Sequence, residues 1–169
     1  MVDSFGDSLS LRQVDLVFGV NKNLGLSTKS FLIGEEDLVF ICRKNHPRLE
    51  TTFSEKDVAN EMFCYVHTDE LPAVMTRQRI ENQLLSDRNF TLRSPSFMSI
   101  LSHIESSNSV AIVPRWLMQR FKDAFNIKML ETEISLPVIE IAMSYNKMNL
   151  NKRMNTQLFT YLSEQFSKK

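Results

Sequence analysis

The stretch RSPSFMSILSHIESSNSVAIVPRWL, Arg93 to Leu117, decides the fold because it holds three elements in a row. Its first half repeats apolar residues at helical spacing: Phe97, Ile100, Leu101 and Ile104. Ser96 stands directly before them, where a serine caps a helix. SVAIV (109–113) then has the length and composition of a buried strand, and Pro114 suits the first turn of a second helix. A helix, a strand and a helix in succession are typical of layered α/β folds.

The rest of the chain continues this alternation. Apolar runs of strand length occur at 14–20, 37–43, 62–66, 90–93 and 138–145. Helical spacing occurs from Phe5 to Leu9, along 72–84 and from about Leu150. Strands that alternate with helices favour parallel neighbours joined by right-handed crossovers. The sequence therefore predicts an α/β fold with mixed, largely parallel sheets.

Two local details refine the helices. Ser54 and Asp57 have the spacing of a capping box, with Asp in place of the usual Glu, so a short helix should begin after Ser54. The last helix should face the core with four residues: Met154, Leu158, Tyr161 and Leu162.

Composition limits the class of protein. The chain has 169 residues, of which 43% are hydrophobic and 24% charged, so it can bury a core. Its 20 basic and 20 acidic residues cancel, so no global field draws it to nucleic acid or to an anionic membrane. No apolar run approaches the roughly 18 residues of a membrane span, and no signal-peptide pattern begins at Met1. We expect a cytoplasmic protein without membrane contact.

The residue types that carry catalysis are present but scattered. With only four glycines, the chain contains neither a nucleophile elbow nor a glycine-rich phosphate loop. His46, His67 and His103 stand apart from one another, and HTDE (67–70) lacks further ligands at a metal-binding spacing. Cys42 and Cys64 lie inside apolar runs, as buried reduced thiols do. The sequence predicts no enzyme, no catalytic residue, no metal and no cofactor.

Binding residues are expected where parallel strands end, because ligands of such sheets bind beyond the carboxyl ends of the strands. Free N–H groups at a helix start there would attract a carboxylate or a phosphate. The predicted positions are Phe18, Gly19, Val20, Val66, His67, Thr68, Ser94, Ser96 and Phe97. For Ser94, Ser96 and Ser99, two interpretations stay open, namely plain helix capping and ligand contact. Arg77 could reach an anion or simply extend into solvent.

The order of motifs resembles the effector-binding domain of LysR-type transcriptional regulators. The motifs are LRQVDLVFG, LIGEEDLVFICRKNHPRL, PSFMSILSHIESSNSVAIVPRWL and IEIAMSYNK, followed by an amphipathic helix. The PSF and SNSVAIVP forms are most similar to the branch of the nodulation and LeuO-type regulators. Other branches usually carry a glycine pair where Ser107 to Ser109 stand.

The resemblance implies a periplasmic-binding-protein-like (type 2) fold of two α/β lobes with an effector in the cleft between them. It places part of lobe one and the first crossover strand at 1–35 and lobe two at 36–130. The return crossover strand and the C-terminal helix of lobe one would follow at 131–169. It further implies self-association as a homodimer or tetramer, and DNA binding only through a helix-turn-helix domain.

The family's helix-turn-helix, its linker helix and the first elements of lobe one have no counterpart before Met1. We therefore expect lobe one to be incomplete, with an unpaired sheet edge, and we expect the chain alone not to bind a promoter. Two alternatives from other classes remain, a stand-alone solute-binding module and a small transferase or hydrolase. A secretory signal would favour the first, and a paired base and nucleophile the second.

Overall fold

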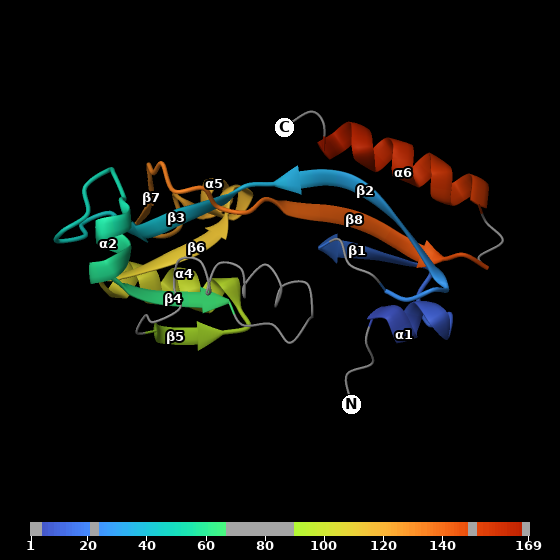
Figure 1. The fold of residues 1–169 in the computed structure, drawn as a ribbon, viewed down its shortest axis with the longest axis horizontal. Coiled ribbons are helices and arrows are strands. Elements are labelled where there is room, and N and C mark those ends of the chain that lie inside the picture. The colour runs from blue at the N-terminus through green and yellow to red at the C-terminus, as the bar shows by residue number, and fades with distance from the viewer. Residues whose placement is uncertain (1–4, 21–23, 67–89, 149–151, 167–169) are drawn as a thin grey trace. The chain divides into compact units, whose positions relative to one another are not determined.

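The computed structural model describes residues 5–20, 24–66, 90–148 and 152–166 of the chain. The chain divides into two compact units (Figure 1). Unit 1 comprises Met1–Glu35 and Ile139–Lys169, and unit 2 comprises 36–138. The chain therefore passes from unit 1 into unit 2 and back again, and each unit is described by itself below.

Unit 1 is built on a three-stranded sheet in the order β1-β8-β2. The strands are β1 (Leu16–Val20), β2 (Thr28–Glu36) and β8 (Ile139–Asn146), and the helices are α1 (Phe5–Ser10) and α6 (Lys152–Phe166). β1 and β8 are antiparallel, with Phe18 opposite Met143. Among the described residues, this sheet thus departs from the largely parallel arrangement that the sequence predicted. β1 and β8 lie far apart in the chain, so the crossover argument that favours parallel neighbours does not apply to this pair.

The core of unit 1 is aromatic. Phe31 of β2 stacks on Tyr145 of β8, with ring centroids 5.8 Å apart, and meets Phe159 of α6 at 4.8 Å. Leu158 and Leu162 pack against the same cluster, as the sequence predicted. The prediction that Met154 and Tyr161 also face the core is wrong, since they are 45% and 59% exposed. Phe159 contacts the sheet instead, which turns the buried face of the helix away from Met154 and Tyr161.

Unit 2 contains a five-stranded sheet in the order β5-β4-β6-β3-β7. The strands are β3 (Leu38–Arg43), β4 (Met62–Val66), β5 (Phe90–Ser94), β6 (Ser109–Pro114) and β7 (Ile127–Leu130). β4 is parallel to β5 and to β6, whereas β3 is antiparallel to both β6 and β7. Four strands therefore run in one direction and β3 runs in the other. The prediction of a mixed, largely parallel sheet is confirmed for this unit.

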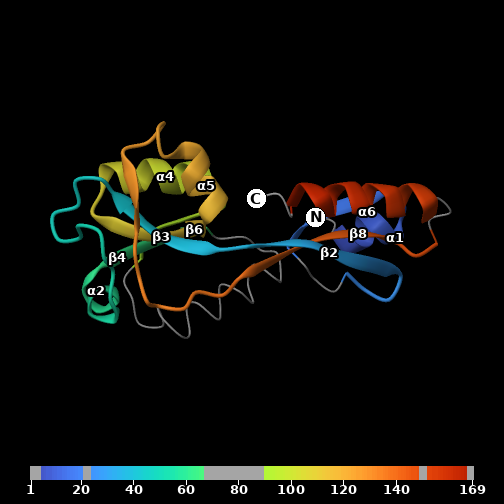
Figure 2. The same ribbon diagram turned by 90° about the horizontal axis from the view of Figure 1, so that it is seen from above.

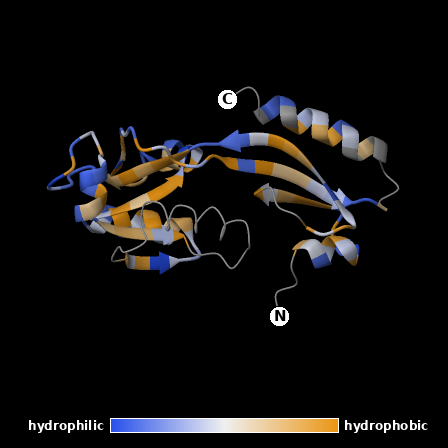
Figure 3. Cartoon of the chain, in the orientation of Figure 1, coloured by the Kyte–Doolittle hydropathy of each residue, from blue (hydrophilic) through white to orange (hydrophobic). Residues whose placement is uncertain are grey.

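Two apolar layers cover the faces of this sheet. Helices α4 (Phe97–Ser106) and α5 (Arg115–Phe121) lie on one face and α2 (Glu55–Asn60) lies on the other side (Figure 2). The α4 layer is built around Ile100, Leu101 and Ile104, which are all fully buried. The opposite layer is built around Phe40, Phe53 and Phe63. Figure 3 shows the hydrophobic colouring concentrated on the strands between these layers.

The capping residues predicted from the sequence mark correctly where α4 and α2 begin. Ser96 caps α4 by accepting a hydrogen bond from the Ser99 N–H at 3.4 Å. Ser54 precedes α2, and its backbone N–H and its hydroxyl both donate to the Asp57 carboxylate, at 2.8 and 2.6 Å. These bonds lower the pKa of Asp57 from its usual value, because they stabilise the charged form. The helix expected along 72–84 lies outside the described residues.

The burial of α4 makes a first prediction possible. Leu101→Ala should lower the free energy of unfolding by about 2–5 kcal/mol, since it empties a fully buried site. Met98→Ala on the same helix is the control, because Met98 is 40% exposed and its truncation should change stability by about 0.5 kcal/mol or less. Urea unfolding measures both values. Equal losses for the two variants would contradict the assignment of the buried face.

Candidate functional site

The predicted site residues of unit 2 meet where β4 and β5 end and α4 begins. Val66 and Ser94 are direct partners in the parallel register of β4 and β5. Ser94 is buried, and its hydroxyl oxygen accepts a hydrogen bond from the Ser96 N–H at 3.2 Å. Phe97 follows as the first residue of α4 and packs partly against the core. The structure thus brings Val66, Ser94, Ser96 and Phe97 together at one end of the sheet.

The start of α4 has unused donors at this point. The Ser99 N–H is bonded to the Ser96 side chain, and the Ile100 N–H donates to the Ser96 carbonyl. The N–H groups of Phe97 and Met98 have no acceptor among the described residues. The first turn of α4 also contains no acidic side chain. Two backbone donors, the helix dipole and the serine hydroxyls therefore provide an arrangement suited to an anion.

The predicted site residues of unit 1 lie on β1. Phe18, Gly19 and Val20 pair with Met143, Ala142 and Ile141 of β8. Phe18 is 47% exposed, and a Cβ atom placed on Gly19 would meet no atom within 4 Å. This end of β1 is therefore open and apolar. It forms a second candidate cluster, which lies within unit 1.

Other predicted positions lie outside the described residues. They include the site residues His67 and Thr68, the rest of HTDE and Arg77. Their part in the site stays a prediction.

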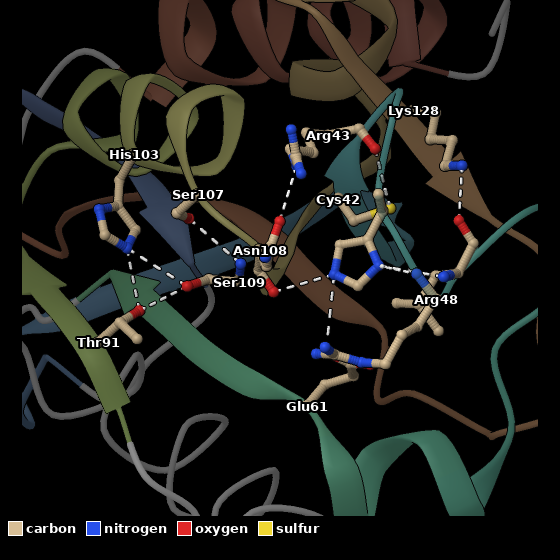
Figure 4. A network of polar contacts seen from close by, with 12 residues as sticks. Cys42, Arg43, Arg48, Glu61, Thr91, His103, Ser107, Asn108, Ser109 and Lys128 are labelled. Carbon is tan, nitrogen blue, oxygen red and sulfur yellow. Dashed lines mark hydrogen bonds and ion pairs between the residues drawn. The ribbon is translucent and has the colours of Figure 1, made fainter.

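A buried polar network, which no local sequence pattern predicts, occupies the other end of the unit 2 sheet (Figure 4). His46 and Glu61 have side chains that are 0% and 2% exposed. The Nδ1 atom of His46 accepts from the N–H groups of Arg48 and Leu49, at 3.3 and 3.1 Å. Nε2 lies 3.0 Å from the Asn108 carbonyl oxygen and must therefore donate to it. This fixes one neutral tautomer and ties the turn after β3 to the start of β6.

Glu61 is compensated within the same network. Arg48 binds it with two parallel bonds, from Nε to Oε1 at 2.8 Å and from Nη2 to Oε2 at 2.5 Å. These bonds raise the pKa of Arg48 above its ordinary value, because they favour the charged guanidinium. A buried carboxylate is tolerated only with such a partner. His46 and Glu61 are fifteen positions apart in the chain, so only the fold shows that they meet.

A second polar group connects α4 to the sheet. His103 Nε2 lies 3.0 Å from the Thr91 hydroxyl and 3.4 Å from the Ser109 hydroxyl. Thr91 in turn donates to the Phe63 carbonyl at 3.1 Å. A serine beside a histidine can act as a nucleophile, but Ser109 is 1% exposed and the described contacts of His103 include no carboxylate. These hydrogen bonds connect α4 to β5 and β6.

The thiols are buried, as the sequence predicted. Ala111 of β6 pairs with Ile41 and with Cys64, and successive residues of a strand point to opposite faces. Cys42 and Cys64 accordingly belong to opposite apolar layers and cannot form a disulfide without refolding. Burial raises the pKa of Cys42 to about 11 and that of Cys64 to about 12.

The described residues contain no group of three or more His, Cys, Asp or Glu that could hold a metal ion. In the same part of the chain, no helix is both long and apolar enough to cross a membrane.

Comparison with known proteins gives a consistent result. Residues 3–167 match the family described as the LysR substrate binding domain. The HTH-type transcriptional regulators YbdO and LeuO of Escherichia coli are each 26% identical to the chain, over 126 and 96 residues. These matches cover 75% and 57% of the chain but only 42% and 30% of the two regulators. The chain thus spans less than half the length of these relatives.

A solved structure confirms the fold class. The regulatory domain of CcmR from Synechocystis PCC6803, in complex with 2-PG, superposes with a TM-score of 0.75 at 11% identity. The match covers 94% of this chain and 76% of the other. The periplasmic-binding-protein-like type 2 fold is therefore present, as the family resemblance implied.

The raised pKa values of Cys42 and Cys64 predict that both thiols react slowly in the folded protein. At about pH 8, Cys42 and Cys64 should stay protonated and react with a thiol reagent far more slowly than in the unfolded chain. Ser102→Cys, at an exposed position of α4, is the positive control. Reaction is followed by absorbance with and without urea. Rapid reaction of both native thiols in folded protein would contradict the burial described above.

Proposed function

Because the chain belongs to the LysR substrate binding domain family, we propose that it is the effector-sensing part of a DNA-binding transcriptional regulator. The observation that carries the proposal is the start of α4, where two backbone N–H groups and the Ser94 and Ser96 hydroxyls gather beside the ends of β4 and β5. The described residues of this site offer binding groups and no nucleophile with a base. A sensor domain needs only groups that bind a ligand, whereas an enzyme also needs groups that carry out a reaction.

We further propose that the effector is a small anion. The α4 N-terminus supports this, since its donors and its dipole favour a carboxylate or a phosphate. The CcmR regulatory domain is a fold neighbour solved with the small molecule 2-PG. We propose that Phe18, Gly19 and Val20 supply an apolar wall of the binding site, and that His67 and Thr68 add to the polar groups at the start of α4. The family resemblance supports a location between the two lobes, with the lobes corresponding to units 1 and 2.

The proposed mechanism is a population shift. A small molecule changes the balance between two arrangements of the lobes only by its differential affinity for them. In the full-length regulator, that shift would be passed to helix-turn-helix domains and alter contact with a promoter. We propose that the protein works in this way in the cytoplasm, as a homodimer or a tetramer. The HTH-type relatives support the DNA-binding role of the whole protein.

The two alternative functions, a solute-binding module and a small enzyme, predict different experimental results. A stand-alone solute-binding module would bind its ligand without any change in affinity for a promoter. A small transferase or hydrolase would turn over a substrate. The buried Ser109 and the scattered histidines favour neither transfer nor hydrolysis.

The anion site can be tested with Ser96→Gly. Glycine at an N-cap costs only a few tenths of a kcal/mol relative to serine, so the fold should stay stable while one hydroxyl is lost. A panel of small carboxylates and phosphate esters is first screened by thermal shift for a ligand of the parent chain. Loss of one bond to a charged ligand should then weaken binding by about tenfold or more. Calorimetry measures the dissociation constants.

Ser102→Ala is the matched control, since Ser102 is an exposed serine of the same helix outside the site. Thr68→Val provides a second probe that leaves the cap of α4 intact. Equal affinity of Ser96→Gly, Thr68→Val and the parent chain would place the ligand elsewhere. A panel with no ligand at all would count against the sensor proposal.

Self-association is tested separately. Leu11, Leu26 and Met148 of unit 1 are 66%, 96% and 68% exposed, and β1 forms an edge of its sheet. Exposed apolar residues beside a strand edge favour association, so light scattering should give a mass above the 19.6 kDa of one chain. Leu26→Lys should lower that mass, whereas Met129→Lys in unit 2 should not. A stable monomer of the parent chain would refute the proposal.

A further inference from the structure

The hydroxyl group of Ser94 is buried at the start of α4 with its hydrogen unused. Its oxygen accepts a hydrogen bond from the Ser96 N–H at 3.2 Å, and none of the described contacts gives its hydrogen an acceptor. Ser94 is only 9% exposed, so bulk water satisfies this hydrogen poorly. A buried donor is unfavourable in a folded protein unless an ordered water or a ligand supplies the acceptor.

The other unused groups beside Ser94 are donors as well. The N–H groups of Phe97 and Met98 have no acceptor among the described residues, and an N–H group can only donate. The Ser96 oxygen already accepts from the Ser99 N–H at 3.4 Å, so its own hydrogen is the group that it still offers. Two N–H groups and two hydroxyl hydrogens therefore gather at the start of α4.

The negative charge that favours a helix N-terminus is also missing here. At the start of α5, the Trp116 N–H donates to the Glu36 carboxylate at 2.8 Å, and α2 has Glu55 and Asp57 in its first turn. The first turn of α4 contains no acidic side chain. Its N-terminus therefore leaves room for an anion that comes from outside the described residues.

We propose that the start of α4 selects oxyanions whose bound oxygens carry no proton, and that Ser94 is the residue that determines this specificity. The inference rests on the proposed anion site and names the chemical class that the site takes. Carboxylates, sulfate esters and fully ionised phosphate esters belong to this class, because their oxygens can accept every unused hydrogen of the site.

A proton on a bound oxygen is unfavourable for a geometric reason. If it points at the N–H group of Phe97 or Met98, it meets a second hydrogen and no acceptor. If it is donated to the Ser94 oxygen, the Ser94 hydrogen stays without an acceptor. In both cases a donor of the site loses its partner, and this cost falls on the protonated ligand alone.

The test compares methyl sulfate with methyl phosphate, which have nearly the same shape. At about pH 5 both carry a single negative charge, and methyl phosphate differs by one proton, which it loses above about pH 6. Methyl sulfate should bind about fivefold or more tightly at about pH 5, since one donor of the site is satisfied only by the proton-free anion. At about pH 8 this preference should disappear.

Binding is followed in the full chain by NMR, through the amide signals of Phe97 and Met98. The described elements of the site also carry titratable groups, which act alike on the two anions at about pH 5 because their charges are equal. These groups are Cys64 and Tyr65 on β4, Arg93 on β5, and His103 and Glu105 on α4. The melting temperature checks that the protein is folded at each pH.

Two variants examine the part of Ser94. Ser94→Ala removes the buried hydrogen, so it should weaken methyl sulfate binding by about fivefold and reduce the preference at about pH 5. Ser102→Ala is the matched control, an exposed serine of α4 outside the site, and should change neither value. The comparison of the two anions in the parent chain needs no variant, so it holds even where Ser94→Ala does not fold.

The outcomes are distinct. A preference for methyl sulfate at about pH 5 that is absent at about pH 8, read at Phe97 and Met98, supports the inference. Equal affinities at about pH 5, or no response of these two amides to either anion, overturn it. An unchanged preference in folded Ser94→Ala overturns the role of Ser94. Selective binding of methyl sulfate without any effect on promoter binding by the full-length regulator would refute the sensor proposal and leave this inference standing.

Discussion

Burial of β3 and β6 on both faces is the constraint on which the rest of unit 2 depends. Val39 to Cys42 and Val110, Ala111 and Val113 are at most 5% exposed, so each strand needs an apolar layer above and below it. The α4 stripe supplies one layer and the phenylalanines of β3 and β4, with Phe53, supply the other. Because α4 must lie along the sheet to cover β6, its N-terminus is held beside the ends of β4 and β5. The candidate anion site is a consequence of this packing.

The two ends of the same sheet differ in how their polar groups are satisfied. At the His46 end, both ring nitrogens and the Glu61 carboxylate have partners, and the network closes the turn after β3. At the Ser96 end, the Phe97 and Met98 N–H groups have no acceptor within the described chain. Unpaired donors are unfavourable in a folded protein unless water or a ligand reaches them. This contrast supports the proposal that the Ser96 end of the sheet binds the ligand, as is common in α/β sheets, while the network at the other end stabilises the turn after β3.

The sequence predicts those elements whose signal is local. The α4 stripe, its Ser96 cap and the Ser54–Asp57 box depend on residues a few positions apart, and all three are confirmed. The residue pattern alone does not predict β7, because IKML is only four residues long, or β2, because its apolar residues adjoin rather than alternate. The family resemblance does imply a crossover strand within 1–35, the region that contains most of β2. The buried face of α6 depends on Phe31 and Tyr145, which lie outside the helix, so periodicity alone misplaced Tyr161. The pairing of His46 with Glu61 joins the turn after β3 to the residue before β4 and has no local signal in the sequence.

The candidate anion site belongs to unit 2 alone, and this limits what a ligand bound there can do. Helices α4 and α5 pack on one layer of unit 2, and β6 leads from the end of one helix to the start of the other. A ligand that contacts only this unit binds every arrangement of the chain equally and shifts none of them. The proposed sensing mechanism therefore also needs ligand contacts from unit 1, and the exposed end of β1 at Phe18 and Gly19 is the surface proposed to make them.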